Sequence, residues 1–537
     1  MLHPLLTGRA SRRFGSARFA TRREVARAGL FKKRPNSIFI GFFESTPMYW
    51  SGPGGVLLQA GPRGGKLSTI LGTTICSGTL LGNVVVLDLR GELAFISQDQ
   101  TPDRKFAYWW NPAFLHGLLC HRLNPLDYLT KDSRTLVSDT KVLCENLIPS
   151  SGAPQAEYFE RRAREFLEAI ILTLVELRGV LTFPLLYMAI NSVPGGGEDY
   201  LDLAFEMSRC SHAIAGRVEE EIAMSRQSGS NGFHGILGEL MKAVAPLSDP
   251  LLMASVSPPF DFSMADLCRA DQAAQVYLMP PAEFAEAWAP VIKAIFVAGM
   301  IYKTRAPQAP QQTWVLDEIG QLGNFPLAVK MLTYGAGFGL RPALVYQSYA
   351  QMRMTGPGAE TIIPASTACQ IVFAVREIGT AEMVSKTIGA ESYVFDDEAQ
   401  QDRARQARRE AIYSLFEGED PIKAAMIIAH RSREAQRQSL QHRMLMTPDE
   451  VLGLPEDKGL IFVDGLAHPI LMTRRPYWEM RGLAGRFHPN PYHPPLDRVR
   501  VKTLFGHRTL RVVEELVPEE FAHYPQYRSG FWSKAKE

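Results

Sequence analysis

Short runs of apolar residues, separated by amphipathic or turn-rich segments, recur along most of the chain. Several of these runs are rich in β-branched residues and lack alternation with polar ones. That pattern is typical of central strands in a parallel sheet that is covered on both faces. An apolar segment of helical character follows several runs, as in LSTILGTTICSGTLL after the first of them. The pattern predicts an α/β domain with runs in the segments 56–60, 83–92, 273–281, 312–326, 340–352 and 368–377, closed by a hairpin over 459–480.

The middle of the chain follows a helical pattern instead. From about residue 131 to 245 apolar positions recur at helical spacing, for example at Phe159, Ala163, Phe166 and Ile170. We therefore expect an all-α domain inserted into the α/β domain. The segment 396–445 is charged and helix-prone, which indicates an exposed excursion, and the chain after 487 shows little pattern.

The bulk composition is that of an ordinary globular protein. Of 537 residues, 46% are hydrophobic and 21% are charged, and the formal net charge of +2 gives no general affinity for polyanions. The six cysteines show no paired spacing, which favours a reducing compartment. The best apolar stretch, 169–190, is interrupted by Glu176 and Arg178. Since a membrane-spanning helix needs about 20 apolar residues, the chain is expected not to span a membrane by itself.

The N-terminal arm is the exception to this balance. Within the first 35 residues it holds many basic residues against the single acid Glu24: Arg9, Arg12, Arg13, Arg18, Arg22, Arg23, Arg27, Lys32, Lys33 and Arg34. Such an arm suits an anionic partner such as DNA, RNA or a membrane surface. A solvated tail and an organellar transit peptide are the alternatives.

A glycine-rich loop between the first predicted strand and the helix after it resembles a phosphate-binding loop. In that setting backbone N–H groups and the helix start face an anion, and a lysine reaches the outer phosphates. The usual spacing is G-x-x-x-x-G-K-[ST], but only three residues separate the first glycine from the last one here. The spacing is restored if Ala60 takes the first glycine position, with a cost if that position needs positive φ. The candidate phosphate-binding residues are Gly61, Pro62, Arg63, Gly64, Gly65, Lys66, Leu67 and Ser68.

Charged and polar residues also stand at the carboxyl ends of other predicted strands. The run TWVL delivers Asp317 and Glu318 to the carboxyl end of a strand, where open α/β sheets bind ligands. We expect Asp317 to organise Mg²⁺, with Ser68 as a second metal ligand, and Glu318 to polarise the attacking water. Gln347 ends another strand and is placed to sense a γ-phosphate or to position water. The role of the charged end of VVVLDLRGE cannot be derived from the sequence.

Taken in order, these motifs resemble those of one family, the coupling ATPases of type IV secretion systems. The resemblance runs from about residue 15 to about 480. It includes GSARFATRREVARAGL, GPRGGK at the position of the Walker A loop, VVVLDLRGE, HRLNPLDYL, VLDEIGQLGNFP at the position of the Walker B motif, and GLRPALVYQSYAQM. It implies a RecA-like P-loop NTPase domain with a central, mostly parallel sheet and an inserted all-α domain. ATP and Mg²⁺ are the implied ligands, and catalytic roles fall to Asp317, Glu318 and Gln347.

The resemblance divides the chain into five parts. They are a basic N-terminal arm (1–46), the first part of the nucleotide-binding domain (47–135), the all-α inserted domain (136–260), the second part of the nucleotide-binding domain (261–487) and a C-terminal tail (488–537).

The implied partners are type IV secretion components and either relaxase-bound DNA or protein effectors, with DNA also contacted by the basic arm. A homo-hexamer is implied too. The expected location is cytoplasmic, at the inner membrane only through a partner.

The sequence departs from the family pattern in three places. The transmembrane anchor is absent, the Walker A loop is altered, and Ala336 stands where the family has an arginine that reaches a neighbouring subunit's nucleotide. Two hypotheses therefore stay open. The chain is either an ATP-hydrolysing coupling protein or a non-hydrolysing scaffold of the same fold that recruits substrates.

Overall fold

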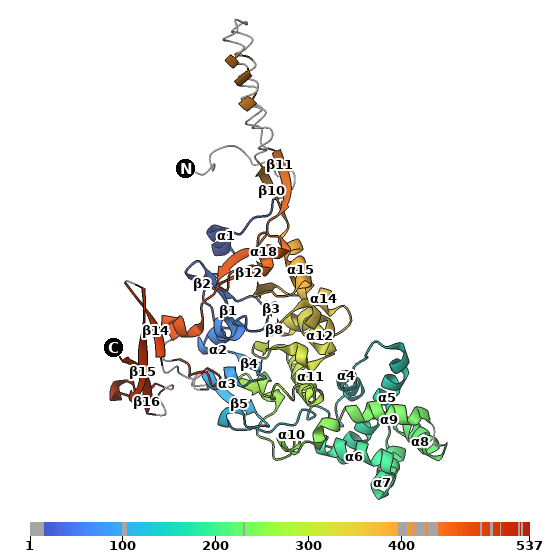
Figure 1. Cartoon of the computed structure of the whole chain (residues 1–537). Coiled ribbons are helices and arrows are strands. Elements are labelled where there is room, and N and C mark those ends of the chain that lie inside the picture. Colours follow the sequence, from blue (N-terminus) through green and yellow to red (C-terminus); the bar gives the residue numbers. More distant parts are fainter. Residues whose placement is uncertain are drawn as a thin grey trace.

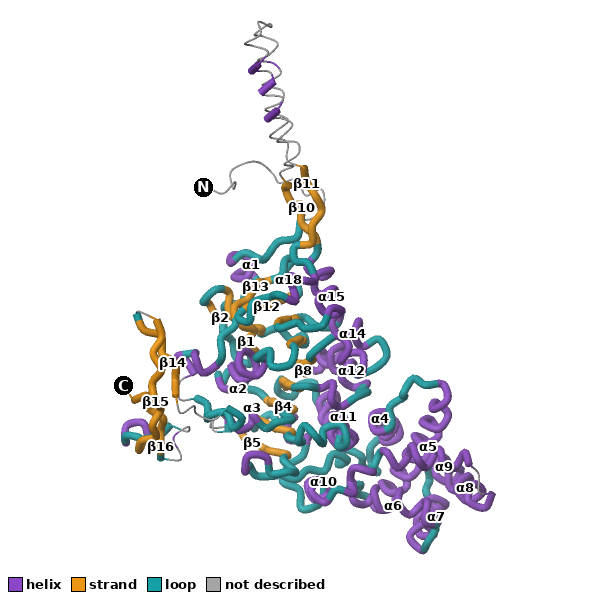
Figure 2. The backbone as a smooth tube through the Cα atoms, in the orientation of Figure 1, coloured by secondary structure: helices purple, strands orange, loops and turns teal. Residues whose placement is uncertain are grey.

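A large twisted sheet forms the centre of the molecule in this computed structural model (Figure 1). The structure describes residues 16–98, 105–228, 231–395, 439–483, 486–493, 498–504, 506–524 and 530–536, with a few isolated residues between 405 and 426 and residue 527. Within these residues, eleven strands form the sheet in the order β2-β1-β13-β12-β9-β3-β8-β7-β4-β6-β5. Figure 2 shows helices on its faces and a separate helical region at its lower right-hand side.

The strands from β9 to β5 in that order run parallel. Their apolar runs are buried on both faces, as the lack of alternation predicted. All six strands predicted for this region are present. The region also contains β5, which was not predicted. The bounds are β3 Val56–Ala60, β4 Asn83–Leu87, β5 Lys105–Trp110, β6 Ala273–Leu278, β7 Gln312–Leu316, β8 Leu340–Tyr346 and β9 Cys369–Phe373.

Antiparallel strands extend the sheet beyond β9. The predicted closing hairpin is confirmed as β12 (Lys458–Val463) and β13 (Ile470–Thr473), and β12 pairs with β9. A second hairpin, β1 (Ile38–Phe43) and β2 (Thr46–Trp50), pairs with β13 and forms the edge of the sheet. This hairpin was not predicted from the sequence; β1 lies in the segment 1–46 predicted as the basic arm, and most of β2 lies just after it.

Alternate residues of the central strands pack into two different cores. Val56, Leu58 and Val86 point to one core, which includes residues of the helices α2 (Gly72–Cys76) and α3 (Glu92–Ser97). Leu57 and Val85 point to the other, which continues into α11 and the helical region. The other helices around the sheet are α1 Arg22–Arg27, α11 Ala289–Arg305, α12 Pro326–Tyr334, α13 Tyr349–Met354, α14 Ala359–Ala365, α15 Ile378–Ile388 and α18 Pro448–Leu452.

The helical region between β5 and β6 confirms the predicted all-α insertion. Its longest helix, α5, buries a continuous apolar stripe from Ala163 to Val175. The helices are α4 Leu136–Leu147, α5 Pro154–Arg178, α6 Phe183–Gly195, α7 Glu198–Arg209, α8 Ala213–Ser228, α9 Asn231–Lys242 and α10 Pro250–Ser255. The RecA-like α/β fold with an inserted helical domain is therefore the fold of this chain.

Two regions near the C-terminus differ from the prediction or lie beyond it. Most of the charged excursion at 396–445 lies outside the described residues, except that β11 (Ser439–Met444) pairs with β10 (Ala390–Phe395). The tail, for which no element was predicted, forms a three-stranded antiparallel sheet of β14 (Arg498–Thr503), β15 (Gly506–Leu516) and β16 (Phe531–Lys536). Figure 1 shows this small sheet to one side of the large one.

Strand β5 begins with a buried lysine, which yields a test of the fold. Burial lowers the pKa of Lys105 to about 7, and its Nζ donates to the carbonyl oxygen of Leu80 at 2.8 Å. Above pH 7 the folded chain has released a proton that the unfolded chain keeps up to about pH 10.4. The stability of the native chain relative to Lys105→Met should therefore rise between pH 7 and 9, by at most about 1.4 kcal/mol per pH unit. Urea unfolding of both proteins at the two pH values measures the difference, and an equal difference at both values would contradict the prediction.

Candidate nucleotide-binding site

The predicted phosphate loop connects the carboxyl end of β3 to a helix. Gly64 N donates to the Gly61 carbonyl oxygen at 3.0 Å, which closes a tight turn, and Gly61 N donates to the Ala374 carbonyl oxygen at 3.2 Å. Ala60 is the last residue of β3, and its φ is not positive. The Cβ of Ala60 therefore costs nothing at the position that usually holds glycine. The backbone needs positive φ at Gly65 (+80°) and also, at some cost for a non-glycine residue, at Arg63 (+57°).

Two glycines of the loop, Gly61 and Gly64, occupy places that leave no room for a Cβ. A Cβ on Gly61 would lie 2.4 Å from the carbonyl oxygen of Ala374, and one on Gly64 would lie 2.7 Å from the Cβ of Ala374. The loop therefore packs its backbone directly on the end of the neighbouring strand. Arg474 Nη1 donates to the Gly64 carbonyl oxygen at 2.6 Å and holds the loop from the other side. A backbone fixed in this way, at the start of a helix, fits a bound phosphate chain.

The helix after the loop begins with a π-turn over Leu67–Leu71 and continues as α2. Ser68 Oγ donates to the Gly65 carbonyl oxygen at 3.1 Å, and Thr69 Oγ1 donates to the same oxygen at 2.7 Å. The hydroxyl of Ser68 thus lies at the loop, beside the cavity in which the predicted metal ion would bind.

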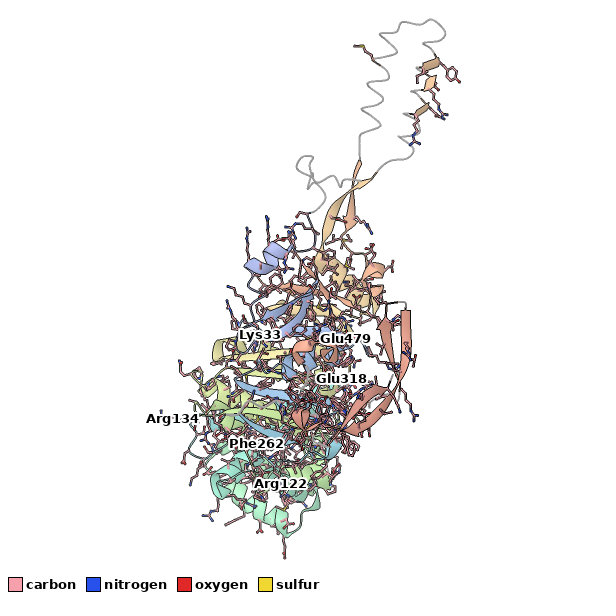
Figure 3. All side chains as sticks on the ribbon, turned by 90° about the vertical axis from the view of Figure 1, so that its left-hand side faces the viewer. Lys33, Arg122, Arg134, Phe262, Glu318 and Glu479 are labelled. Atoms are coloured by element: carbon pink, nitrogen blue, oxygen red, sulfur yellow. The ribbon has the colours of Figure 1, made fainter. Side chains whose placement is uncertain are left out.

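The structure brings together four side chains that are widely separated in the sequence. Lys66 Nζ lies 2.9 Å from Asp317 Oδ1 and 2.7 Å from Glu318 Oε1. Gln347 Nε2 donates to the same Glu318 oxygen at 3.1 Å. This geometry follows from the sheet order, because β8 lies between β3 and β7 and the three carboxyl ends share one edge. Figure 3 shows Glu318 within the body of the molecule, beside the strands of the large sheet.

The charges of this cluster shift the pKa values of its members. Burial disfavours the charged form of Lys66, but Asp317 and Glu318 outweigh burial and raise the lysine pKa. Burial raises the pKa of Asp317, although Lys66 opposes that effect. For Glu318, burial is outweighed by Lys66 and the pKa is lowered. Glu318 is thus held ionised, and its Oε2 receives no hydrogen bond from the described residues.

These side chains surround a cavity of about 620 Å³ at the carboxyl edge of the sheet. The volume is typical of sites for small molecules and cofactors. Of the predicted residues, Pro62 through Ser68, Asp317, Glu318 and Gln347 line the cavity, whereas Gly61 lies behind the loop against Ala374. Within the described residues, no group of three or more His, Cys, Asp or Glu side chains could hold a metal ion. A Mg²⁺ ion here would therefore depend on phosphate oxygens and water, as Mg²⁺ usually does.

Other residues of the cavity were not predicted as site residues. Asp88 directly follows the strand β4; burial raises its pKa to about 7, while a hydrogen bond from Ala94 N opposes the rise. Burial also raises the pKa of Glu92. Both acids line the cavity together with Arg90. The sequence pointed to this strand end without assigning it a role.

The chain after β13 supplies a further wall. Trp478, Asn490 and His493 line the cavity from a segment that crosses over α2 and α3. His488 N donates to the Ile96 carbonyl oxygen at 2.8 Å, and Arg486 Nη1 donates to the Ser77 carbonyl oxygen at 3.1 Å. No sequence motif marks these residues, because only the folded chain brings them to the loop.

A second cavity of about 400 Å³ adjoins the phosphate loop. Trp478 lines both cavities, and the second one adds apolar side chains such as Leu452, Leu454 and Val375. The loop therefore has a cavity on each side.

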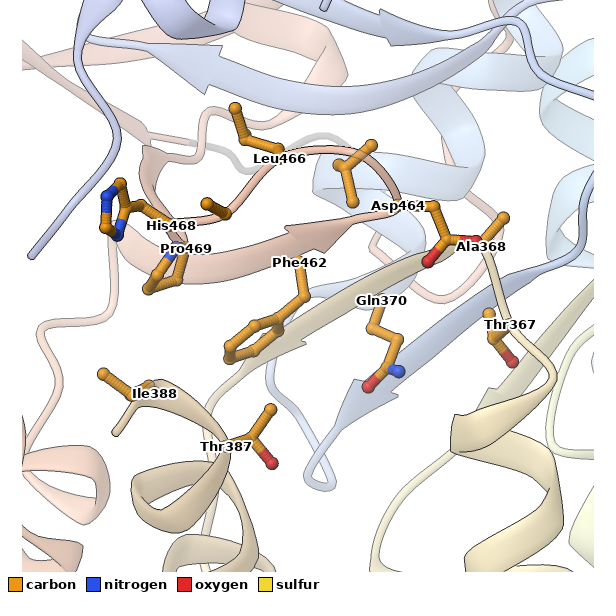
Figure 4. Close-up of a pocket in the computed structure, with 12 residues that line it drawn as sticks. Thr367, Ala368, Gln370, Thr387, Ile388, Phe462, Asp464, Leu466, His468 and Pro469 are labelled. Atoms are coloured by element: carbon orange, nitrogen blue, oxygen red, sulfur yellow. The ribbon is translucent and has the colours of Figure 1, made fainter. Parts of the chain in front are cut away.

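A smaller cavity of about 220 Å³ lies at the opposite edge of the sheet, where β9 begins and β12 ends (Figure 4). Its polar side chains are partly used by the fold. Gln370 Nε2 donates to the Pro364 carbonyl oxygen at 2.8 Å, and Thr367 Oγ1 donates to the Ile363 carbonyl oxygen at 2.5 Å. These bonds hold the end of α14, so this cavity gives no sign of a chemical role.

The arginine substitution noted in the sequence lies at the amino end of β8. Ala336 belongs to the 3₁₀ turn Gly335–Phe338 and is half-buried. Arg341, the nearest arginine along the chain, is fully buried. Its guanidinium donates to Thr313 Oγ1 at 2.9 Å and to the carbonyl oxygen of Asn36. Arg341 therefore stabilises the fold and is not exposed to a neighbouring molecule.

A glycine loop between a strand and a helix, a lysine paired with two carboxylates, and a glutamine on the intervening strand define a P-loop NTPase fold of the RecA-like class. The Type IV secretory system Conjugative DNA transfer family matches residues 9–417 and 422–503, and the chain belongs to this family. Its role is therefore in conjugative DNA transfer with a type IV secretion system, as a coupling protein.

Known proteins agree with this assignment. The conjugal transfer protein TraG of Escherichia coli is 23% identical over 517 residues, a match that covers 86% of this chain and 76% of TraG. TraG of Rhizobium radiobacter is 23% identical over 382 residues, covering 67% of this chain and 52% of that protein. The structure of the bacterial conjugative coupling protein TrwBΔN70 is similar, with a TM-score of 0.61 and 16% identity, and the match covers 87% of this chain and 94% of that one. The plasmid coupling protein TrwB in complex with ADP and Mg²⁺ gives a TM-score of 0.60 at 16% identity, covering 87% of this chain and 96% of that one.

Among the helices of the described residues, none has the length and apolar character needed to cross a membrane.

Proposed function

We propose that this chain binds ATP with Mg²⁺ and hydrolyses it to drive the delivery of substrates to a type IV secretion apparatus. The observation that carries the proposal is the contact of Lys66 Nζ with both Asp317 and Glu318 in a cavity lined by the phosphate loop. A cation held there by two carboxylates is placed to exchange them for phosphate oxygens. The solved complexes of TrwB with ADP and Mg²⁺ and with the non-hydrolysable ATP analogue ADPNP support the choice of nucleotide.

The residues predicted from the sequence have distinct roles in the proposal. The backbone of Gly61–Gly65 holds the phosphate chain, and Lys66 reaches its outer phosphates. Asp317 and the hydroxyl of Ser68 would hold Mg²⁺ directly or through water. The metal, when bound, neutralises the charge that develops on the phosphate oxygens.

The proton step falls to Glu318. Lys66 keeps its carboxylate ionised, and Oε2 is available to accept a proton from the attacking water. Gln347 already donates to the other oxygen of Glu318. Gln347 can therefore position the attacking water and sense the γ-phosphate at the same time.

The coupling function determines the partners that we propose. Relaxase-bound DNA or protein effectors are the substrates, and components of the secretion apparatus receive them. A homo-hexamer at the cytoplasmic side of the inner membrane, held there through a membrane partner, is the proposed assembly. The basic arm, of which residues 1–15 lie outside the described residues, is proposed to contact DNA.

A non-hydrolysing scaffold of the same fold is the second candidate. It is favoured by Ala336, since a small apolar side chain at this position cannot reach the nucleotide of a neighbouring subunit. Arg341 does not replace the missing group because it is buried in its own chain.

Release of phosphate from ATP by the purified full chain, with and without Mg²⁺, separates the two candidates. The proposal expects Mg²⁺-dependent turnover that the Glu318→Gln chain lacks. ATP binding without turnover under any condition, including added DNA, would establish the scaffold instead.

A further inference from the structure

The C-terminal sheet of β14, β15 and β16 carries a surface that the nucleotide site does not use. The family match ends at residue 503, so β15 and β16 lie beyond the matched residues. Most described side chains of β15 and β16 are exposed, and Figures 1 and 2 show the sheet standing to one side of the large one. Two of the three strands of this exposed sheet therefore lie beyond the residues that the family match covers.

The register of this sheet aligns positive residues. Arg511 in the central strand pairs with Arg498 of β14 on one side and with Lys536 of β16 on the other. Like charges directly opposite one another destabilise an antiparallel sheet. Residues 498–513 contain five Lys and Arg and no Asp or Glu. Neither Arg511 nor Lys536 forms an ion pair with a carboxylate of the described residues, so an external anion is the natural partner of this row.

Aromatic side chains lie at the other end of the same face. Along β16, Trp532, Lys534 and Lys536 are two residues apart and therefore share one face of the sheet. Lys534 Nζ lies 3.6 Å from Glu515 Oε2, so the one acid of β15 that faces this side is already paired. The Phe521 and Trp532 rings are stacked, with centroids 5.6 Å apart.

The stack extends toward solvent. Tyr524 lies almost parallel to Phe521, with an interplanar angle of 16° and centroids 6.4 Å apart, and Tyr524 is 38% exposed. The face thus combines a row of cations with stacked aromatic rings.

We propose that this basic and aromatic face of the C-terminal sheet binds single-stranded DNA. Arg511 and Lys536 contact phosphates, and unstacked bases pack on the ring of Tyr524. Positive surfaces that carry exposed aromatic rings are how proteins hold single strands without sequence preference. An anionic lipid surface needs only the cations, whereas the parallel stack of Phe521 and Tyr524 provides a place for a planar base. The proposal goes beyond the nucleotide site and does not depend on ATP turnover.

Fluorescence anisotropy of a labelled oligo(dT) strand with the full chain tests the proposal over a series of salt concentrations. The double variant Arg511→Gln with Lys536→Gln should bind at least about tenfold more weakly at low salt. Since each phosphate contact on a single strand contributes about 0.7 to the salt slope, the slope should become less steep by about 1.4. Tyr524→Ala should weaken binding by about fivefold or more without changing the slope, because it removes stacking and no charge.

The matched control is Lys131→Gln with Arg134→Gln, which removes the same charge from exposed positions of the helical side. Figure 3 shows Arg134 at the periphery of the molecule. The proposal would be overturned if the double variant of Arg511 and Lys536 bound oligo(dT) with the same affinity and the same salt slope as the control. Loss of binding to phosphatidylserine vesicles with unchanged binding to oligo(dT) would also overturn it, in favour of a membrane surface. Lys66→Ala should leave oligo(dT) binding unchanged, so a failed nucleotide site and a failed DNA surface give different results.

Discussion

Replacing Glu318 by Gln is expected to lower kcat for ATP hydrolysis by about 100-fold or more and to change the affinity for ATP only a few-fold. The substitution keeps the size of the side chain and its hydrogen bond with Gln347. It removes the carboxylate that we propose as the proton acceptor, and general bases contribute roughly 10²–10⁴-fold to rates. Lys66 retains Asp317 at 2.9 Å, so the phosphate loop keeps its ionic anchor.

Single-turnover phosphate release and equilibrium binding of ATP measure the two effects separately. Glu382→Gln, an exposed position on α15, is the matched control and should behave as the native chain does. Turnover by the Glu318→Gln chain at the native rate would show that another group, such as Glu92 or Asp88 in the same cavity, accepts the proton.

Replacing Gly61 by Ala is expected to weaken ATP binding by about 30-fold or more. The added Cβ would lie 2.4 Å from the carbonyl oxygen of Ala374, a backbone atom that cannot rotate away. The loop must therefore move, and its hydrogen bond from Gly61 N to that oxygen is lost. Because a phosphate cradle depends on the positions of its backbone N–H groups, a small displacement has a large effect on binding.

Gly216→Ala is the control for this substitution. Gly216 lies in helix α8, and a Cβ there meets nothing within 4 Å, so the variant should bind ATP as the native chain does and gain slightly in stability. Native ATP affinity of the Gly61→Ala chain would mean that the nucleotide does not use this loop.

The central strands could be predicted because their sequences leave little choice of secondary structure. Runs such as VVVL of β4 and ALVY of β8 are apolar at successive positions, which is typical of parallel strands buried on both faces. β5 was missed because it begins with Lys105 and has half-exposed positions in its middle. The three C-terminal strands were missed because none of them carries the continuous apolar run that marks a buried strand.

The candidate site was predictable only in part, and for a physical reason. Lys66, Asp317, Glu318 and Gln347 each end a strand or open a helix, so the parallel arrangement of the strands brings them to one edge, and the structure places them in contact. Trp478 and Asn490 reach the same cavity through a crossing segment without regular structure. Nothing in their spacing signals that approach.

The sequence also could not show whether the phosphate loop closes. Counting residues left open whether Ala60 could stand at the first glycine position. The backbone answers it, because the turn needs positive φ at Arg63 and Gly65 and not at Ala60. The altered spacing is therefore compatible with a closed loop.

Isothermal titration of ATP with Mg²⁺ into the native chain and into Lys66→Ala tests the central claim most directly. Lys66 is the side chain that joins the loop to both carboxylates, at 2.9 and 2.7 Å. The account predicts one ATP bound per native chain and an affinity lower by about 30-fold or more in the variant, since a buried cation paired with phosphate contributes a charge-assisted interaction. Equal affinity of the two chains, or no binding of ATP by the native chain, would contradict it.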